Sequence, residues 1–194
     1  MRTLQWAAWL LVLSPVSIAA EDAAAPAAPA GTGKILYEFW SGIEGTDLNA
    51  LKTHAKFPDS PSGTQELTAF DIATERDDNY GARIRGYVHP PTTGEYTFFF
   101  ASDDQGELYL STDEDPVNVV RIAFVSEWTD PQEWEKTPEQ KSQPVKLEAG
   151  KKYYIEARMK EGEGGDNLSV GWAIPGARLE RPIAGKWLSP PDPK

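Results

Sequence analysis

Apolar and polar residues alternate along much of the chain in the manner of short β-strands. In the run 94–102, the aromatic residues Tyr96, Phe98 and Phe100 occupy every second position. Successive side chains of a strand point to opposite faces of the sheet, so these three rings share one face. Phe99 lies on the opposite face among polar residues, and we expect this wetter face to be partly covered by other parts of the protein.

A second run, 152–160, alternates more regularly and predicts a strand with one buried face. Apolar residues occupy the positions Tyr153, Ile155, Ala157 and Met159. The positions between them are mostly charged, and we expect that face to be in contact with solvent. These positions are Lys152, Tyr154, Glu156, Arg158 and Lys160.

Further strands are expected from shorter runs that are separated by residues favouring turns. The runs are 35–40, 83–88, 107–111, 119–124, 144–147 and 168–172. One or two helical turns are expected at 47–54, with Asp47 as the N-cap, and the segment 130–143 is polar and broken by proline. Many short strands without a regular alternation of helix and strand predict an all-β fold. We expect an antiparallel β-sandwich or barrel-like sandwich with short helical turns.

Residues 1–20 have the features of a secretory signal peptide. Arg2 precedes an apolar run from Leu4 to Leu13, and small residues follow around Ala19 and Ala20. The apolar run is shorter than the roughly 20 residues needed to cross a bilayer. We therefore expect this segment to be removed and the product to be secreted, periplasmic or on the cell surface, with no transmembrane segment.

The rest of the chain is expected to divide into one folded domain and two flanking segments. Residues 21–33 are rich in Ala, Pro and Gly and lack large apolar side chains, which is typical of a tether. Residues 189–194 form a proline-rich tail. The intervening residues, 34–188, are numerous enough to form one domain around a single hydrophobic core.

Charge and composition exclude several classes of function. The chain has 19 Lys and Arg against 30 Asp and Glu, a formal net charge of −11, and it lacks the clustered basic residues that nucleic-acid binding requires. It has no cysteine and only two histidines, which excludes thiolate nucleophiles and cysteine-containing or three-histidine zinc sites. It also has no Gly-x-Ser-x-Gly, His-Glu-x-x-His or phosphate-loop motif, so we expect that the protein is not an enzyme.

Two stretches of the sequence resemble the PA-fourteen domain family, which is named for the protective antigen of a bacterial toxin. They are residues 79–116 (NYGARIRGYVHPPTTGEYTFFFASDDQGELYLSTDEDP) and 149–172 (AGKKYYIEARMKEGEGGDNLSVGW). The motifs that carry the resemblance include a Pro-x-x-Gly-x-Tyr-x-Phe strand, an Asp-Asp turn and a Gly-rich loop before a strand ending in Trp. The resemblance covers roughly residues 34–188 and implies a β-sandwich module. In the better understood members, this module binds carbohydrate through calcium.

Asp103 and Asp104 are adjacent carboxylates between two predicted strands. Neighbouring anions repel one another unless a cation lies between them, and Ca²⁺ takes about 6–8 oxygen ligands. The resemblance implies a calcium site here in which the Asp103–Asp104 peptide bond is cis. From the residues alone, an Asp-Asp pair is also ordinary turn chemistry on a solvated loop, and both interpretations stay open at this point.

The loop 160–167 offers further ligands for the expected ion. Its glycines allow backbone carbonyls to turn inward, and Asp166 and Asn167 carry side-chain oxygens. The loop departs from the pattern of the flocculins in this family, which have an asparagine-rich loop here. A glycine-rich hairpin loop that binds nothing is the alternative interpretation.

Carbohydrate binding is expected at the rim of this site, where an ion can accept two neighbouring hydroxyls of a terminal sugar. Asp104 and Gln105 are candidates to bond the sugar, and Trp128 is a candidate to stack on its ring. Tyr80 is a second candidate for stacking. For both aromatic residues, packing inside the protein is the alternative role.

The sequence therefore predicts a secreted, non-catalytic module that binds a glycan or polysaccharide through Ca²⁺. The alternative is a structural or protein-interaction β-sandwich that has a protein partner at the cell surface and no sugar site. A hydrolase is a third class, because paired carboxylates can hydrolyse glycosides. With 30 acidic residues in the chain, however, some carboxylate pair will always exist.

Overall fold

The computed structural model of the chain describes residues 31–72, 76–177 and 179–193, and these residues form twelve short strands and four short helical segments joined by turns. The predicted signal peptide, residues 1–20, and most of the predicted tether lie outside the described residues. The strands are β1 (Ile35–Ser41), β2 (Gly63–Leu67), β3 (Asp71–Ile72), β4 (Tyr80–Val88), β5 (Gly94–Asp103), β6 (Gly106–Ser111), β7 (Val119–Val125), β8 (Val145–Leu147), β9 (Tyr153–Glu161), β10 (Asn167–Ala173), β11 (Leu179–Glu180) and β12 (Leu188–Ser189). The helical segments are α1 (Leu48–Lys52) and the 3-10 turns η1 (Pro116–Asn118), η2 (Pro138–Gln140) and η3 (Gly185–Trp187).

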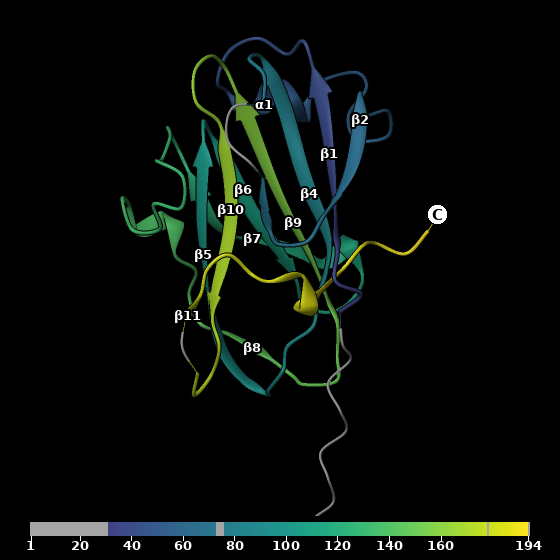
Figure 1. Cartoon of the computed structure of the whole chain (residues 1–194), viewed down its shortest axis with the longest axis vertical. Coiled ribbons are helices and arrows are strands. Elements are labelled where there is room, and N and C mark those ends of the chain that lie inside the picture. The colour runs from purple at the N-terminus through teal and green to yellow at the C-terminus, as the bar shows by residue number, and fades with distance from the viewer. Residues whose placement is uncertain (1–30, 73–75, 178, 194) are drawn as a thin grey trace, which may run out of the picture.

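The strands form two antiparallel sheets (Figure 1). The larger sheet has the order β2-β1-β4-β9-β6-β7, with β12 paired to β4, and the smaller sheet has the order β11-β10-β5-β8, with β3 paired to β10. Within the described part of the chain, each sheet ends in edge strands, so the fold is an open β-sandwich and not a closed barrel. The predicted fold class is confirmed.

The core between the sheets contains the aromatic residues that the alternation of β5 predicted. Tyr96, Phe98 and Phe100 are all 0% exposed. The ring of Trp172, from the neighbouring strand β10, lies 5.1 Å from that of Tyr96 and 6.1 Å from that of Phe98 between centroids. Burial of large aromatic rings contributes strongly to stability because it removes much apolar surface from water.

The opposite face of β5 is also covered, as expected. Phe99 is 3% exposed, because the guanidinium carbon of Arg181 lies 3.7 Å from the centroid of its ring. The positive charge faces the electron-rich ring and shields it from water.

The prediction that the charged face of β9 contacts solvent is wrong for three of its residues. Tyr154, Glu156 and Lys160 are 4%, 5% and 0% exposed. The reason is that β9 lies in the interior of the larger sheet, between β4 and β6, and that α1 packs against it. Charged and polar groups on this face bond one another: the Tyr154 hydroxyl donates to the Glu156 carboxylate at 2.5 Å, and Arg158 pairs with the same carboxylate.

The predicted helical turn is confirmed in α1, which lies beside the end of the sandwich that carries the predicted ion site. The Asp47 carboxylate accepts a hydrogen bond from the backbone N–H of Asn49 at 2.9 Å, which satisfies a free amide at the start of the helix. Leu48 and Leu51 are buried and fix the helix to the sandwich.

Both ends of the described chain lie against the sandwich. The Gly31 N–H donates to the carbonyl of Lys186 at 2.9 Å. Ser189, predicted to begin the tail, is in β12 and pairs with Tyr87 of β4, so strand pairing continues one residue past the expected end of the domain. Among the described residues, no helix is long and apolar enough to span a bilayer.

Replacement of Phe98 by Ala tests the importance of the aromatic core. Phe98 is 0% exposed, and removal of a buried Phe side chain costs about 3–5 kcal/mol because it also leaves a cavity. We expect the free energy of unfolding in urea to fall by that amount. Val117→Ala is the control, since Val117 is 78% exposed and its loss is expected to change the free energy by less than about 0.5 kcal/mol. Equal stability of the two variants would contradict this account of the core.

Candidate metal and carbohydrate site

Two connections between strands meet at one end of the sandwich, the upper end in Figure 1. Asp104 and Gln105 connect β5 to β6, and residues 162–166 connect β9 to β10. Because β5 pairs with β10 and β6 pairs with β9, the two connections are brought together by the strand order of both sheets. The residues predicted to bind an ion lie on these connections and at the strand ends beside them.

Three carboxylates gather where these connections meet. One carboxylate oxygen of each of Asp103, Asp104 and Glu161 lies within 4.8 Å of the others. The Asp103–Asp104 peptide bond is cis, as the resemblance implied. The Asp104 carboxylate accepts a hydrogen bond from the Gly162 N–H at 2.9 Å, and the Asp104 N–H donates to the carbonyl of Lys160 at 3.1 Å. Backbone contacts from the end of β9 therefore hold Asp104 in place.

Gly162 is required for this close approach. A Cβ atom at this position would lie 2.8 Å from the Thr46 methyl carbon and 3.2 Å from an oxygen of the Asp104 carboxylate. Either contact is tighter than ordinary van der Waals packing allows. A side chain at this position would therefore displace the carboxylate that its amide now holds.

Glu161 is a member of the cluster that our sequence analysis missed. It is 0% exposed, and neither oxygen of its carboxylate has a hydrogen-bond partner among the described residues. A buried carboxylate without a partner is costly, and it normally binds a cation or a proton. The signal was present in the alternation of β9, where Glu161 follows Met159 on the core-facing side.

Asn167 lies beside the cluster with one free oxygen. It pairs with Asp103 across β5 and β10 and is 2% exposed. Its side-chain amide N–H donates to the carbonyl of Thr129 at 2.8 Å, which turns the amide oxygen to the other side. That oxygen is buried and has no partner among the described residues, so it is available to an ion.

Asp166 lies near the cluster, but other groups occupy its carboxylate. The hydroxyl of Tyr80 donates to it at 2.7 Å, and the N–H of Arg76 donates to its two oxygens at 3.0 and 3.2 Å. Its position suits a residue that holds the loop in shape, and its role as an ion ligand stays a prediction. Tyr80 is 1% exposed, so it packs inside the protein and presents no surface on which a sugar can stack.

The cluster carries an excess of negative charge. Burial, together with the charges of Asp104 and Asp166, raises the pKa of Asp103 to about 6. Burial and the charges of Asp104, Asp103 and Asp166 raise the pKa of Glu161 to about 8. Both shifts have the sign expected for carboxylates that are desolvated and crowded by like charges.

One buried cation lies beside the cluster and offsets part of its charge. Lys160 is 0% exposed, and its ammonium group donates to the backbone carbonyls of Gly45 and Glu161. The positive charge of Lys160 acts to lower the pKa of Glu161, but burial and the neighbouring carboxylates outweigh it. The ammonium group donates to backbone carbonyls, and both carboxylate oxygens of Glu161 remain without a hydrogen-bond partner among the described residues.

Gln105 and Trp128, which were predicted at the rim together with Asp104, have different neighbours. Gln105 accepts a hydrogen bond from the Leu48 N–H at 3.2 Å through its side-chain oxygen, which ties it to α1. Trp128 forms a β-bridge with Asp103 and is 46% exposed. The ammonium nitrogen of Lys136 lies 3.2 Å from the centroid of a Trp128 ring. The indole thus remains partly accessible next to the carboxylates.

The side chains of the cluster and of Asn167 offer only oxygen atoms as metal ligands. Carboxylate and amide oxygens are the ligands that hard cations such as Ca²⁺ prefer, whereas zinc and copper sites draw on sulfur or imidazole. The unpartnered oxygens of Glu161 and Asn167 fit such a cation, as do the crowded carboxylates of Asp103 and Asp104. The residues present therefore suit the group that the family resemblance implies.

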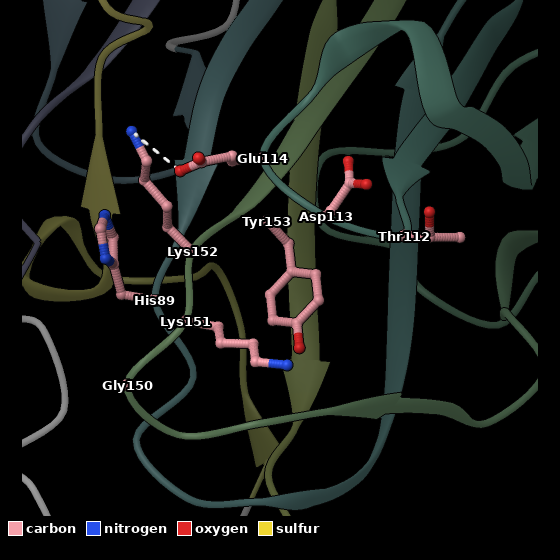
Figure 2. Close-up of a pocket in the computed structure, with 8 residues that line it drawn as sticks. All are labelled: His89, Thr112, Asp113, Glu114, Gly150, Lys151, Lys152 and Tyr153. Atoms are coloured by element: carbon pink, nitrogen blue, oxygen red, sulfur yellow. Dashed lines mark ion pairs between the residues drawn. The ribbon is translucent and has the colours of Figure 1, made fainter.

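A separate cavity of about 550 Å³ lies at the opposite end of the larger sheet (Figure 2). Tyr153 at the start of β9 lines it, whereas Glu161 ends the same strand. The Lys152 ammonium nitrogen lies 3.6 Å from the Glu114 carboxylate and 2.9 Å from that of Asp192. The lining residues are His89, Thr112, Asp113, Glu114, Gly150, Lys151, Lys152 and Tyr153. Lys152 thus has two anionic partners here, whereas the Nδ1 atom of His89 is buried and has no hydrogen-bond partner among the described residues.

Comparison with known proteins identifies relatives of this domain. N-acetyl-beta-glucosaminyl-glycoprotein 4-beta-N-acetylgalactosaminyltransferase 1 of Mus musculus is 36% identical over 152 residues, which cover 75% of this chain. This chain spans only 14% of the length of that relative. The similarity therefore concerns one part of a much longer protein.

Two solved structures share the fold. The A domain of epithelial adhesin 6 from Candida glabrata, in complex with Galb1-3GlcNAc, has a TM-score of 0.57 at 14% identity, covering 87% of this chain and 95% of that one. The PA14 sugar-binding domain from an RTX adhesin has a TM-score of 0.57 at 11% identity, covering 78% of this chain and 98% of that one.

A family model described as "PA14 domain" matches residues 46–186. The match spans both connections that form the acidic cluster, and it agrees with the resemblance found in the sequence motifs. The described part of the chain has the antiparallel β-sandwich that the solved relatives share. The chain belongs to the PA14 (PA-fourteen) domain family.

Proposed function

We propose that this domain is a non-catalytic module that binds carbohydrate through a calcium ion. The proposed ligands are the side-chain oxygens of Asp103, Asp104, Glu161 and Asn167. The single observation that supports this most strongly is the buried carboxylate of Glu161, which has no hydrogen-bond partner among the described residues and lies with two further carboxylates. A cation removes the repulsion among these groups.

Four side-chain ligands leave part of the coordination of a calcium ion unfilled, since Ca²⁺ takes about 6–8 oxygens. Backbone carbonyls of the loop 162–166 are candidates for some of the remaining positions, and two neighbouring hydroxyls of a sugar are candidates for others. Gln105 and Asp104 are the candidates to bond the sugar. The half-exposed ring of Trp128 offers an apolar face for the ring carbons of the sugar.

The similarity to sugar-binding domains supports the ligand class. The RTX adhesin relative is described as a sugar-binding domain, and the epithelial adhesin 6 domain is in complex with a disaccharide. The sequence lacks the nucleophile motifs of hydrolases, which supports a binding role over catalysis. Together with the signal-like residues 1–20, these features support a module that works outside the cytoplasm. The similarity to a transferase concerns 14% of that enzyme.

Calcium binding is tested with Glu161→Gln, which removes one negative charge at nearly constant volume. We expect the affinity for Ca²⁺, measured by isothermal titration calorimetry, to fall on the order of 100-fold, as befits loss of a direct ligand. Glu114→Gln makes the same chemical change on a side chain that is 68% exposed at the other end of the larger sheet, and it should bind Ca²⁺ like the parent. Unchanged affinity in Glu161→Gln would remove Glu161 from the site.

Carbohydrate binding is tested on a glycan array in the presence of Ca²⁺ and of a chelator. We expect binding that is lost with the chelator and reduced at least about tenfold in Asp104→Asn, because that change weakens both the ion site and its contact with the sugar. If no glycan binds in either condition while Ca²⁺ still binds, the protein-interaction interpretation gains support.

The pH dependence of stability follows from the raised pKa values of Asp103 and Glu161, about 6 and about 8. A carboxyl group whose pKa is higher in the folded state binds its proton more tightly there than when unfolded. Without Ca²⁺, these two groups therefore lower the stability as the pH rises from about 4 to about 8.

We expect the increase in melting temperature on addition of Ca²⁺ to be larger at pH 8 than at pH 5, because the ion competes with protons for the same oxygens. Differential scanning fluorimetry with Ca²⁺ or a chelator measures this difference. In Glu161→Gln the pH dependence should be smaller. An increase that is the same at both pH values would contradict the proposed ligand set.

A further inference from the structure

Beyond the acidic cluster, the segment between β7 and β8 runs along the free edge of β5. The Thr129 N–H donates to the carbonyl of Ser102 at 2.9 Å, and the Ser142 N–H donates to that of Phe98, also at 2.9 Å. Between these two attachments the chain projects outward, at the left of β5 in Figure 1. The projecting part, residues 130–139, starts next to Trp128 and therefore next to the proposed ion site, and Gln140 and Lys141 contact β5 again.

Lys136 connects Trp128 to a first cavity. Its ammonium group donates to the carbonyl of Trp128 at 3.0 Å and lies over the indole ring. The same lysine lines a cavity of about 380 Å³ together with Trp134, Glu133, Glu135 and Arg181. This cavity is thus one side chain away from the rim of the acidic cluster.

Arg181 lines both this cavity and a second one. Its guanidinium nitrogen lies 3.2 Å from the Glu135 carboxylate, and its guanidinium carbon lies 5.8 Å from the centroid of the Trp134 ring. Arg181 also lines a cavity of about 460 Å³ whose lining includes Trp187, Glu180 and Lys186. The two cavities therefore adjoin at Arg181.

The second cavity repeats the chemistry of the first. The indole N–H of Trp187 donates to the Glu180 carboxylate at 3.0 Å, and the Lys186 ammonium nitrogen lies 4.9 Å from the centroid of the Trp187 ring. Each cavity thus offers one indole, at least one carboxylate acceptor and an ammonium donor. Volumes of about 380 and 460 Å³ fall within the range of about 300–1,000 Å³ that is usual for small-molecule sites.

We propose that the two cavities are subsites for the inner sugar units of an extended, neutral glycan. This inference rests on the proposed function, in which the terminal sugar of that glycan is held at the acidic cluster. Indole rings stack on the apolar faces of sugar rings. Carboxylates accept hydrogen bonds from sugar hydroxyls, and ammonium and guanidinium groups donate hydrogen bonds to them. Trp128 and Lys136 join the acidic cluster to the first cavity, and Arg181 joins the first cavity to the second.

The balance of charge favours a neutral ligand. The described residues that line the two cavities include three carboxylates and three cations. The carboxylates are Glu133, Glu135 and Glu180, and the cations are Lys136, Arg181 and Lys186. A polyanionic glycan needs an excess of positive charge along its path, which these cavities do not supply.

The test uses an array of neutral and sulfated or sialylated glycans of one to eight sugar units, in the presence of Ca²⁺. Among neutral glycans that share the recognised terminal sugar, we expect affinity to increase at least tenfold from the shortest to the longer members. Trp134→Ala should reduce the affinity for the longer members about tenfold and leave that for the shortest unchanged. Lys186→Ala, at a side chain that is 65% exposed, should also reduce the affinity for the longer members. Val117→Ala, between β6 and β7, is the control and should leave the affinity unchanged.

The outcomes separate this inference from the proposed function. Binding of the terminal sugar with no gain from added units, or with no effect of Trp134→Ala, would overturn the subsites and leave the calcium site standing. Preference for sulfated or sialylated glycans would overturn the neutral class of ligand. Binding of longer glycans that depends on Trp134 but survives the chelator would support the subsites and refute the calcium-dependent function. Absence of binding to every glycan would refute both.

Discussion

The crowding of carboxylates at one end of the sandwich is the constraint on which the rest of this site depends. Asp103, Asp104 and Glu161 bring an oxygen each to within 4.8 Å of one another, and Glu161 is fully buried. Like charges in a desolvated position repel strongly, so the fold has to hold them together by other means. It does so with regular structure, because Asp103 is the last residue of β5 and Glu161 is the last residue of β9.

The sheets therefore act as the frame of the site. β5 pairs with β10 over residues 97–103, and β9 pairs with both β4 and β6, which fixes the strand ends against the repulsion. The buried ammonium group of Lys160 offsets part of the charge but bonds backbone carbonyls, and the carboxylate oxygens of Glu161 have no hydrogen-bond partner among the described residues. Asp166 is held by Tyr80 and Arg76. A rigid frame with unpaired oxygens is the arrangement that binds a cation without first reorganising.

The surroundings of the site differ on its two sides. Gln105 is tied to α1, whereas Trp128 leads onto the segment that borders β5 and to two cavities that share Arg181. The two cavities combine indole rings with charges of both signs. Their continuity with the acidic cluster is the physical basis for expecting one extended ligand there.

Local patterns in the sequence were sufficient for the fold class, most strands, the capped helix at Asp47 and the Asp103–Asp104 turn, because period-2 alternation and turn residues act over a few positions. The sequence also contained a signal for Glu161, because this acidic residue follows Met159 at the spacing of the buried positions. The significance of that position became clear only from the residues around it in the structure. Tertiary structure alone decided that the charged face of β9 is buried, since coverage depends on neighbouring strands and α1. It also decided which of the 30 acidic residues come together, because Asp103 and Glu161 are separated by much of the chain and meet only through the order in which the strands pair.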